Sequence, residues 1–116
     1  MTIMRDAWIP PTDLDSECLA LCLALNKLNG IDTVESCSGH GQQPFHVWFT
    51  TQQLSALPPL LYWFAGCHCG FYKWTVQART DCAMSPVYFM IEGPAGAFDQ
   101  ADYIARLIEA YTAEQQ

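Results

Sequence analysis

Apolar residues recur at helical spacing near the start of the chain and predict a first helix. They stand three or four positions apart at Leu14, Cys18, Leu21, Cys22, Leu25 and Leu28. Thr12 is the expected N-cap, with Asp15 in the acidic position of a capping box, and Gly30 is the expected left-handed stop. Because Leu19, Leu23 and several alanines make this helix apolar nearly all round, we expect it to be buried on more than one side.

Four later segments have the short apolar or alternating pattern of strands, and we expect strands at 31–37, 44–50, 71–79 and 87–92. Between the second and third, Thr50 and Gln53 form another capping-box pattern that opens a helical segment. Pro58 and Pro59 must break or kink that segment. After a turn at 93–96, a last helix is predicted by the apolar stripe of Ala101, Ile104, Ala105, Ile108 and Tyr111.

This order of helix, two strands, helix, two strands and helix indicates an α+β fold. Short loops join the members of each strand pair, which favours antiparallel hairpins. We therefore predict a four-stranded, mainly antiparallel sheet with its helices mostly on one face. A length of 116 residues suits a single domain that spans 1–116.

The first hairpin is expected to close between Cys37 and Pro44. This register sets Val34 opposite Val47, Glu35 opposite His46 and Ser36 opposite Phe45, and it turns Val34 toward the helices. The other face of the sheet would then carry polar and aromatic side chains: Glu35, Cys37, His46, Trp48, Lys73, Arg79, Tyr88 and Met90. Such a face either binds a planar ligand or forms a dimer interface, in which Trp, Tyr, Met and Arg are common.

The composition adds three expectations. At 51% hydrophobic and 15% charged residues, the chain has more apolar material than one small core hides, which favours a homodimer. No apolar run approaches the roughly 20 residues of a membrane span, and the N-terminus lacks the pattern of an export signal. We therefore expect the six cysteines to be thiols in the cytoplasm.

The net charge of −7 is unevenly distributed. All Asp and Glu residues lie before Ser36 or after Thr80, whereas the only charged residues between them are Lys73 and Arg79. The acidic ends argue against direct nucleic-acid binding. The central block remains suitable for a neutral or basic site.

The sharpest local signal is the loop from Ser36 to Gly41. Gly39 and Gly41 permit positive φ angles on either side of His40, so that successive N–H groups could hold an anion. Cys37 is the candidate nucleophile, with His40 or His46 as its base. The predicted ligand-binding residues are Ser36, Ser38, Gly39, Gly41, Trp48, Lys73 and Arg79. The alternative is a glycine-rich turn whose cysteine has no chemical role.

A metal site is a further interpretation of the same loop. Cys37 and His40 have a ligand-like spacing, and Cys67, His68 and Cys69 could complete the set, but the second cluster lacks standard zinc spacing. We therefore assign no residue as a metal ligand and leave the cofactor unknown. The phosphate-binding, dinucleotide-binding and serine-elbow motifs are absent from the sequence.

The loop and the strand after it resemble a known family. Ser36-Cys37-Ser38-Gly39, followed by residues 44–48, is similar to the Ser-Cys-Ser-Gly region of the wybutosine-synthesis tRNA methyltransferases. The resemblance implies a related fold, a functional loop and S-adenosylmethionine chemistry, although His40 stands where that family usually has Arg. The loop also resembles short uncharacterised proteins of phages and mobile elements, for which no activity is implied.

We expect a small binding or regulatory protein, homo-oligomeric and of phage or mobile-element type, that holds a small ligand or protein partner at the loop and adjoining sheet face. A methyltransferase relative is the first alternative, so whether the protein is an enzyme stays open. The second is an acidic inhibitor of a nucleic-acid-handling complex, such as an anti-defence protein. Its phosphate-mimicking carboxylates would be Asp13, Asp15, Glu17, Asp99, Asp102 and Glu109.

Overall fold

The computed structural model describes residues 8–64, 73–80 and 87–114. Its elements follow the predicted order and confirm the α+β class. They are α1 (Ser16–Asn26), β1 (Ile31–Cys37), the short turn η1 (Gly39–Gly41), β2 (Phe45–Thr51), η2 (Leu54–Ala56), α2 (Leu57–Phe64), β3 (Thr75–Arg79), β4 (Tyr88–Gly93) and α3 (Phe98–Glu114).

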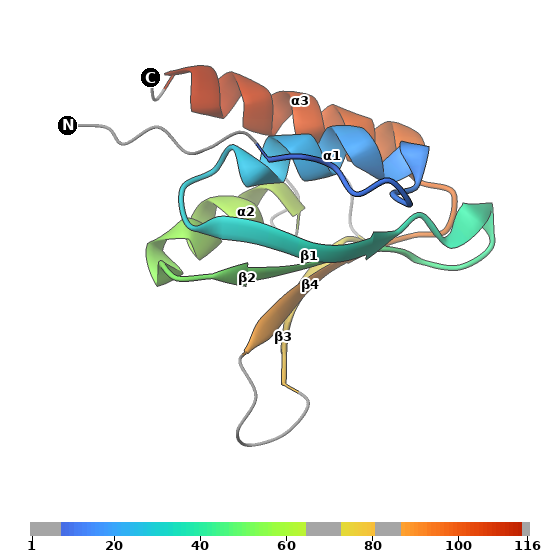
Figure 1. Ribbon diagram of the computed structural model, residues 1–116, viewed down its shortest axis with the longest axis horizontal. Coiled ribbons are helices and arrows are strands. Elements are labelled where there is room, and N and C mark those ends of the chain that lie inside the picture. The colour runs from blue at the N-terminus through green and yellow to red at the C-terminus, as the bar shows by residue number, and fades with distance from the viewer. Residues whose placement is uncertain (1–7, 65–72, 81–86, 115–116) are drawn as a thin grey trace.

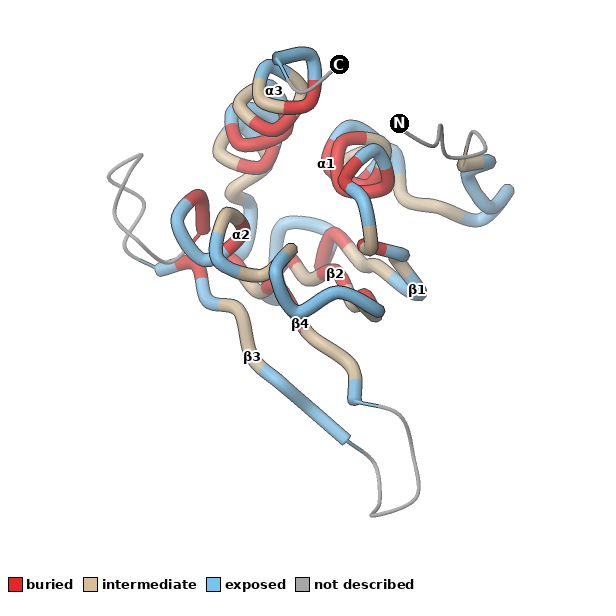
Figure 2. Tube along the Cα trace, turned by 90° about the vertical axis from the view of Figure 1, so that its left-hand side faces the viewer, coloured by how far each residue is buried: buried red, intermediate tan, exposed pale blue. Residues whose placement is uncertain are grey.

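The four strands form one antiparallel sheet in the order β1-β2-β4-β3, so β1 and β3 are its edges. Figures 1 and 2 show the helices gathered on one side of this sheet. Val76 and Ala78 pair with Ile91 and Phe89, as the predicted faces of β3 and β4 require, but Met90, expected on the opposite open face, is only 5% exposed. The opposite face has no helix over it.

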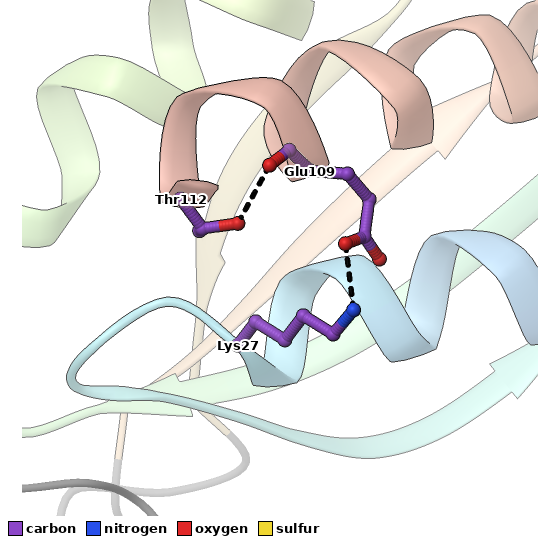
Figure 3. A network of polar contacts seen from close by, with 3 residues as sticks. All are labelled: Lys27, Glu109 and Thr112. Carbon is purple, nitrogen blue, oxygen red and sulfur yellow. Dashed lines mark hydrogen bonds and ion pairs between the residues drawn. The ribbon is translucent and has the colours of Figure 1, made fainter. Parts of the chain in front are cut away.

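The core lies between the sheet and the helices. Phe45, Val47 and Phe49 of β2 and Ile91 of β4 are fully buried there. Helix α1 packs against both β1 and α3, which confirms the prediction of burial on more than one side. The ends of α1 and α3 are also tied by an exposed ion pair in which Lys27 Nζ lies 2.6 Å from Glu109 Oε2 (Figure 3). An exposed pair of this kind contributes at most about 1 kcal/mol, so burial is the main stabilising term.

The predicted start of the first helix is wrong. Thr12 lies in a turn in which Leu14 N–H donates to the carbonyl of Pro11, and the helix begins at Ser16 with Asp15 at the N-cap. Asp15 makes no side-chain bond to its own helix. Its carboxylate instead accepts a hydrogen bond from a loop distant in sequence, and this tertiary contact replaces the local capping box.

The predicted register of the first hairpin is also wrong. Glu35 pairs with Trp48, Ser36 with Val47 and Cys37 with His46, and the register shifts between Thr33 and Glu35. The residue at this bulge, Val34, is 56% exposed instead of facing the helices. The connection after Cys37 is longer than assumed, because residues 38–44 lie between the strands. A slip of two residues keeps Glu35 on its predicted face, whereas the Cys37 sulfur at the end of the strand lies beside Asp15 at the start of α1.

A glycine near the end of β4 makes room for a large side chain. Trp74 is 1% exposed, and its indole N–H donates to Gln100 Oε1 at 2.7 Å. A Cβ on Gly93 would lie 2.6 Å from the Trp74 ring, so no larger residue fits there without displacing the indole.

In the described part of the chain, no helix is both long enough and apolar enough to cross a membrane.

Candidate functional site

Three side chains with metal-binding or acid-base chemistry meet at one end of β1. Asp15 precedes α1, Cys37 ends β1 and His40 lies in η1. A carboxylate oxygen of Asp15, the Cys37 Sγ and a ring nitrogen of His40 all lie within 4.8 Å of one another. Asp15 and Cys37 are half-buried, whereas His40 is exposed. The fold therefore places one oxygen, one sulfur and one nitrogen ligand at an accessible corner of the molecule.

The loop backbone adopts an unusual conformation at this corner. Gly39, His40 and Gly41 have consecutive φ angles of +74°, +54° and +81°. The positive φ angles predicted for the two glycines are thus confirmed, and His40 shares the left-handed region although it has a side chain. A non-glycine residue there is disfavoured by about 1–2 kcal/mol, so the surrounding contacts must hold His40 in place.

Three hydrogen bonds from backbone N–H groups hold the cluster together. Ser38 N–H donates to Asp15 Oδ2 at 2.9 Å, and His40 N–H donates to Ser38 Oγ at 3.1 Å. Gly39 N–H donates to Cys37 Sγ at 3.4 Å. Ser38 itself is fully buried, although it is a polar loop residue. Loop hydrogen bonds therefore orient the side chains of Asp15 and Cys37 directly, and a third fixes the backbone that carries His40.

Asp15 is held in its charged form. Hydrogen bonds from the backbone and the side chain of Ser38 lower the pKa of Asp15, partial burial opposes this shift, and the nearby His40 lowers the pKa further. The carboxylate is thus available as a negatively charged ligand over a wide pH range.

The predicted anion nest gains no support from this geometry. The N–H groups of Gly39 and His40 are already donated to Cys37 and Ser38, and those of Gln42 and Gln43 both donate to the carbonyl of Gly39 at 3.0 Å. Because these four N–H groups are engaged within the loop, they are not available to an anion.

Of the other predicted site residues, His46, Trp48 and Arg79 lie on the uncovered sheet face. His46 stands opposite Cys37 in the sheet register, with Glu92 of β4 as its other neighbour. The guanidinium of Arg79 lies over the Trp48 ring at 6.0 Å from its centroid. Lys73 is exposed just before β3. Cys67, His68 and Cys69 fall outside the described residues.

Ser36 faces the helices and not the solvent. Its Oγ is buried, and no partner meets the distance and angle criteria of a hydrogen bond with it. The Oγ is nevertheless close enough to the thiols of Cys18 and Cys22 to lower their pKa values. Burial has the larger and opposite effect. It raises the pKa of Cys18 to about 12 and also raises the pKa of Cys22. These two thiols therefore remain protonated and unreactive.

A hollow of about 230 Å³ adjoins the base of the loop, between the segment before α1 and the edge of β1. Ser36 and Cys22 line it together with Trp8, Pro11, Asp13, Leu14, Thr33, Val34 and Glu35. Cys37, His40 and His46 are not among its lining residues. The cluster itself is therefore a surface site, suited to a small ligand and not to an enclosed organic substrate.

Sequence reasoning identified Cys37 and His40 but not Asp15 as their partner. The available signal was topological: a helix that packs antiparallel to the next strand begins beside the point where that strand ends. Asp15 and Cys37 are separated by an entire helix and strand, so spacing alone could not join them.

Comparison of the chain with protein-family models, with curated proteins and with solved structures gave no match in any of the three.

Proposed function

We propose that the protein is a small binding protein whose ligand is held at the Ser36–Gly41 loop. The observation that carries this proposal is the convergence of Asp15, Cys37 and His40, with their ligating atoms within 4.8 Å, on a loop fixed by its own hydrogen bonds. A loop that served only as a turn would not require a histidine in the left-handed region, where glycine is less strained.

The arrangement favours binding over thiol catalysis. In a Cys–His–Asp relay the imidazole lies between the sulfur and the carboxylate, which separates these two atoms by about 7 Å or more. Here the Cys37 sulfur and an Asp15 oxygen lie within 4.8 Å of one another. The three groups thus form a triangle around a common point, which is the geometry of a ligand site and not of a proton relay.

The test is to map binding by two-dimensional amide NMR while a library of small fragments is added to the metal-free protein. We expect binders to shift the resonances of Ser38, Gly39, His40 and Gly41, and the His40→Ala variant to lose those shifts. Loop shifts that persist unchanged in the variant, or a loop that is perturbed neither by these fragments nor by a metal ion, would refute the proposal.

We further propose that the protein forms a homodimer through the uncovered sheet face. Exposed Glu35 lies on edge strand β1 and exposed Arg79 on edge strand β3, with half-buried Trp48 on β2 between them. In a two-fold arrangement whose axis is parallel to the strands, β1 of one protomer faces β3 of the other. Glu35, which is level with Gln77 in the sheet register, would then lie opposite the partner's β3, where the Arg79 guanidinium leans back over Gln77 and Trp48.

Charge exchange tests this dimer in sedimentation equilibrium. Glu35→Arg and Arg79→Glu should each weaken dimerisation, because each places like charges opposite one another. The double variant Glu35→Arg/Arg79→Glu should restore it. A monomeric wild-type protein, or single variants that dimerise as well as the wild type, would contradict the proposal.

The proposed location is a reducing compartment, the cytoplasm, because Cys18, Cys22 and Cys37 are all free thiols. The methyltransferase relationship and the phage origin remain predictions. The acidic-inhibitor alternative is weakened because two of its six carboxylates already have partners within the protein: Asp15 accepts a hydrogen bond from the loop, and Glu109 is paired with Lys27.

A further inference from the structure

We propose that the ligand of the loop is a divalent transition-metal ion, with Zn²⁺ as the best fit, held by the Asp15 carboxylate, the Cys37 thiolate and the His40 imidazole. This inference rests on the proposed function and names its ligand. Thiolate, imidazole and carboxylate are the three side-chain types that bind Zn²⁺ in proteins. Three protein ligands at an exposed position leave a fourth coordination site open to water or to an external ligand.

The distances suit such a site. Metal–ligand bonds of about 2.0–2.3 Å in tetrahedral geometry place neighbouring ligand atoms about 3.3–3.6 Å apart. The three atoms already lie within 4.8 Å of one another, so any pair has to approach by at most about 1.5 Å. Small side-chain rotations provide a movement of this size without displacement of the backbone.

Charge supplies an independent reason. A bound divalent cation would be paired with a thiolate and a carboxylate whose ligand atoms already lie within 4.8 Å of one another, and residues 36–44 include no Lys or Arg that would repel it. A divalent cation balances both charges at once. Binding releases the Cys37 proton to solvent, so metal uptake is accompanied by proton release.

The hydrogen bonds of the loop act as the outer shell of this site. Ser38 N–H fixes one carboxylate oxygen of Asp15, and Gly39 N–H points at the Cys37 sulfur. Such outer partners orient the ligands and commonly change metal affinity by about 10- to 100-fold. The left-handed backbone at His40 has the same role, because it turns the imidazole toward the other two ligands at a cost in conformational strain.

The experiment is a Zn²⁺ titration of chelator-treated, phosphine-reduced protein, monitored by calorimetry in competition with a chelator of known affinity. It uses the Cys67→Ser/Cys69→Ser background, so that the second cysteine cluster in the sequence does not contribute. We expect one Zn²⁺ per chain. Asp15→Asn, Cys37→Ser and His40→Gln should each weaken binding at least about tenfold, while the neighbouring exposed carboxylate variant Asp13→Asn should leave it unchanged.

Cobalt provides a spectroscopic signature of the ligand set. Co²⁺ bound to the reduced protein should show a thiolate-to-metal charge-transfer band together with the intense visible bands of a tetrahedral site. The Cys37→Ser variant should lose the charge-transfer band. Zn²⁺ or Co²⁺ binding that is unaffected by this substitution would overturn the proposal.

His40→Gly separates a loss of ligation from a loss of folding. Glycine relieves the left-handed strain, so the metal-free variant should melt at a higher temperature than the wild type while its Zn²⁺ affinity falls. A variant that binds Zn²⁺ as tightly as the wild type would refute the role of His40. If Zn²⁺ does not bind but organic fragments still perturb the loop, this inference fails and the proposed function stands; if neither binds, both fail.

Discussion

Asp15 Oδ2 accepts a 2.9 Å hydrogen bond from the backbone N–H of Ser38 and thereby joins the start of α1 to the loop after β1. Ser38 is fully buried, so removal of the acceptor leaves a buried donor unpaired. We expect Asp15→Ala to lower the free energy of unfolding by about 1–3 kcal/mol. Asp15→Asn keeps an acceptor oxygen and should cost less. Urea unfolding in the presence of a chelator measures both changes, and equal losses would show that charge, not this hydrogen bond, is the important term.

The two loop glycines should respond differently to alanine. At Gly41 an added Cβ meets no atom within 4 Å, so Gly41→Ala introduces only the strain of a positive φ angle, about 1 kcal/mol. At Gly39 the Cβ would lie 2.8 Å from the carbonyl oxygen of Pro44, so the backbone must also move. Thermal unfolding should therefore show a clearly larger loss for Gly39→Ala. Similar losses in the two variants would mean that the loop relaxes freely.

Substitution at the bulge distinguishes the observed register from the predicted one. Val34 is 56% exposed, so Val34→Lys should change the free energy of unfolding by no more than about 0.5 kcal/mol. Val47 is fully buried, and Val47→Ala should cost about 2 kcal/mol. Denaturant unfolding of both variants provides the comparison. Strong destabilisation by Val34→Lys would indicate that this side chain faces the core after all.

The buried thiol of Cys18 predicts a loss of stability at alkaline pH. Its pKa is raised from 9.0 to about 12 in the folded protein, chiefly because of burial. The unfolded chain therefore loses this proton first as the pH rises above about 9, and ionisation favours unfolding until the folded pKa is reached. Stability should be unaffected by this group below pH 9. The free energy of unfolding should fall less steeply between pH 9 and 11 in Cys18→Ala than in the wild type, and identical slopes would contradict the shift.

The parts of the fold that could be predicted are those determined by local pattern. The alternation of Val76 and Ala78 with Thr75, Gln77 and Arg79 gave the correct faces of β3, since each strand face has its own polarity. The bulge was not predictable in this way. Polar Thr33 and Glu35 flank Val34, which is also the pattern of a regular strand with Val34 facing the core.

The candidate site shows the same division. The positive φ angles at Gly39 and Gly41 could be predicted, because glycine is the residue that adopts them most easily. The role of Asp15 could not, because its partner Ser38 lies 23 residues away and the contact depends on how α1 packs beside β1. A local capping-box rule assigned Asp15 a role that the tertiary contact replaces.

The bulge at Val34 has a consequence for the behaviour of the protein in concentrated solution. β1 is an outer strand, and a regular outer strand exposes a row of unpaired peptide groups on which further chains can add to form fibrils. The extra residue interrupts this row midway and increases the local twist, while exposed Asp32 and Glu35 repel a similar strand. The irregularity that misled the register prediction thus protects this side of the sheet against aggregation.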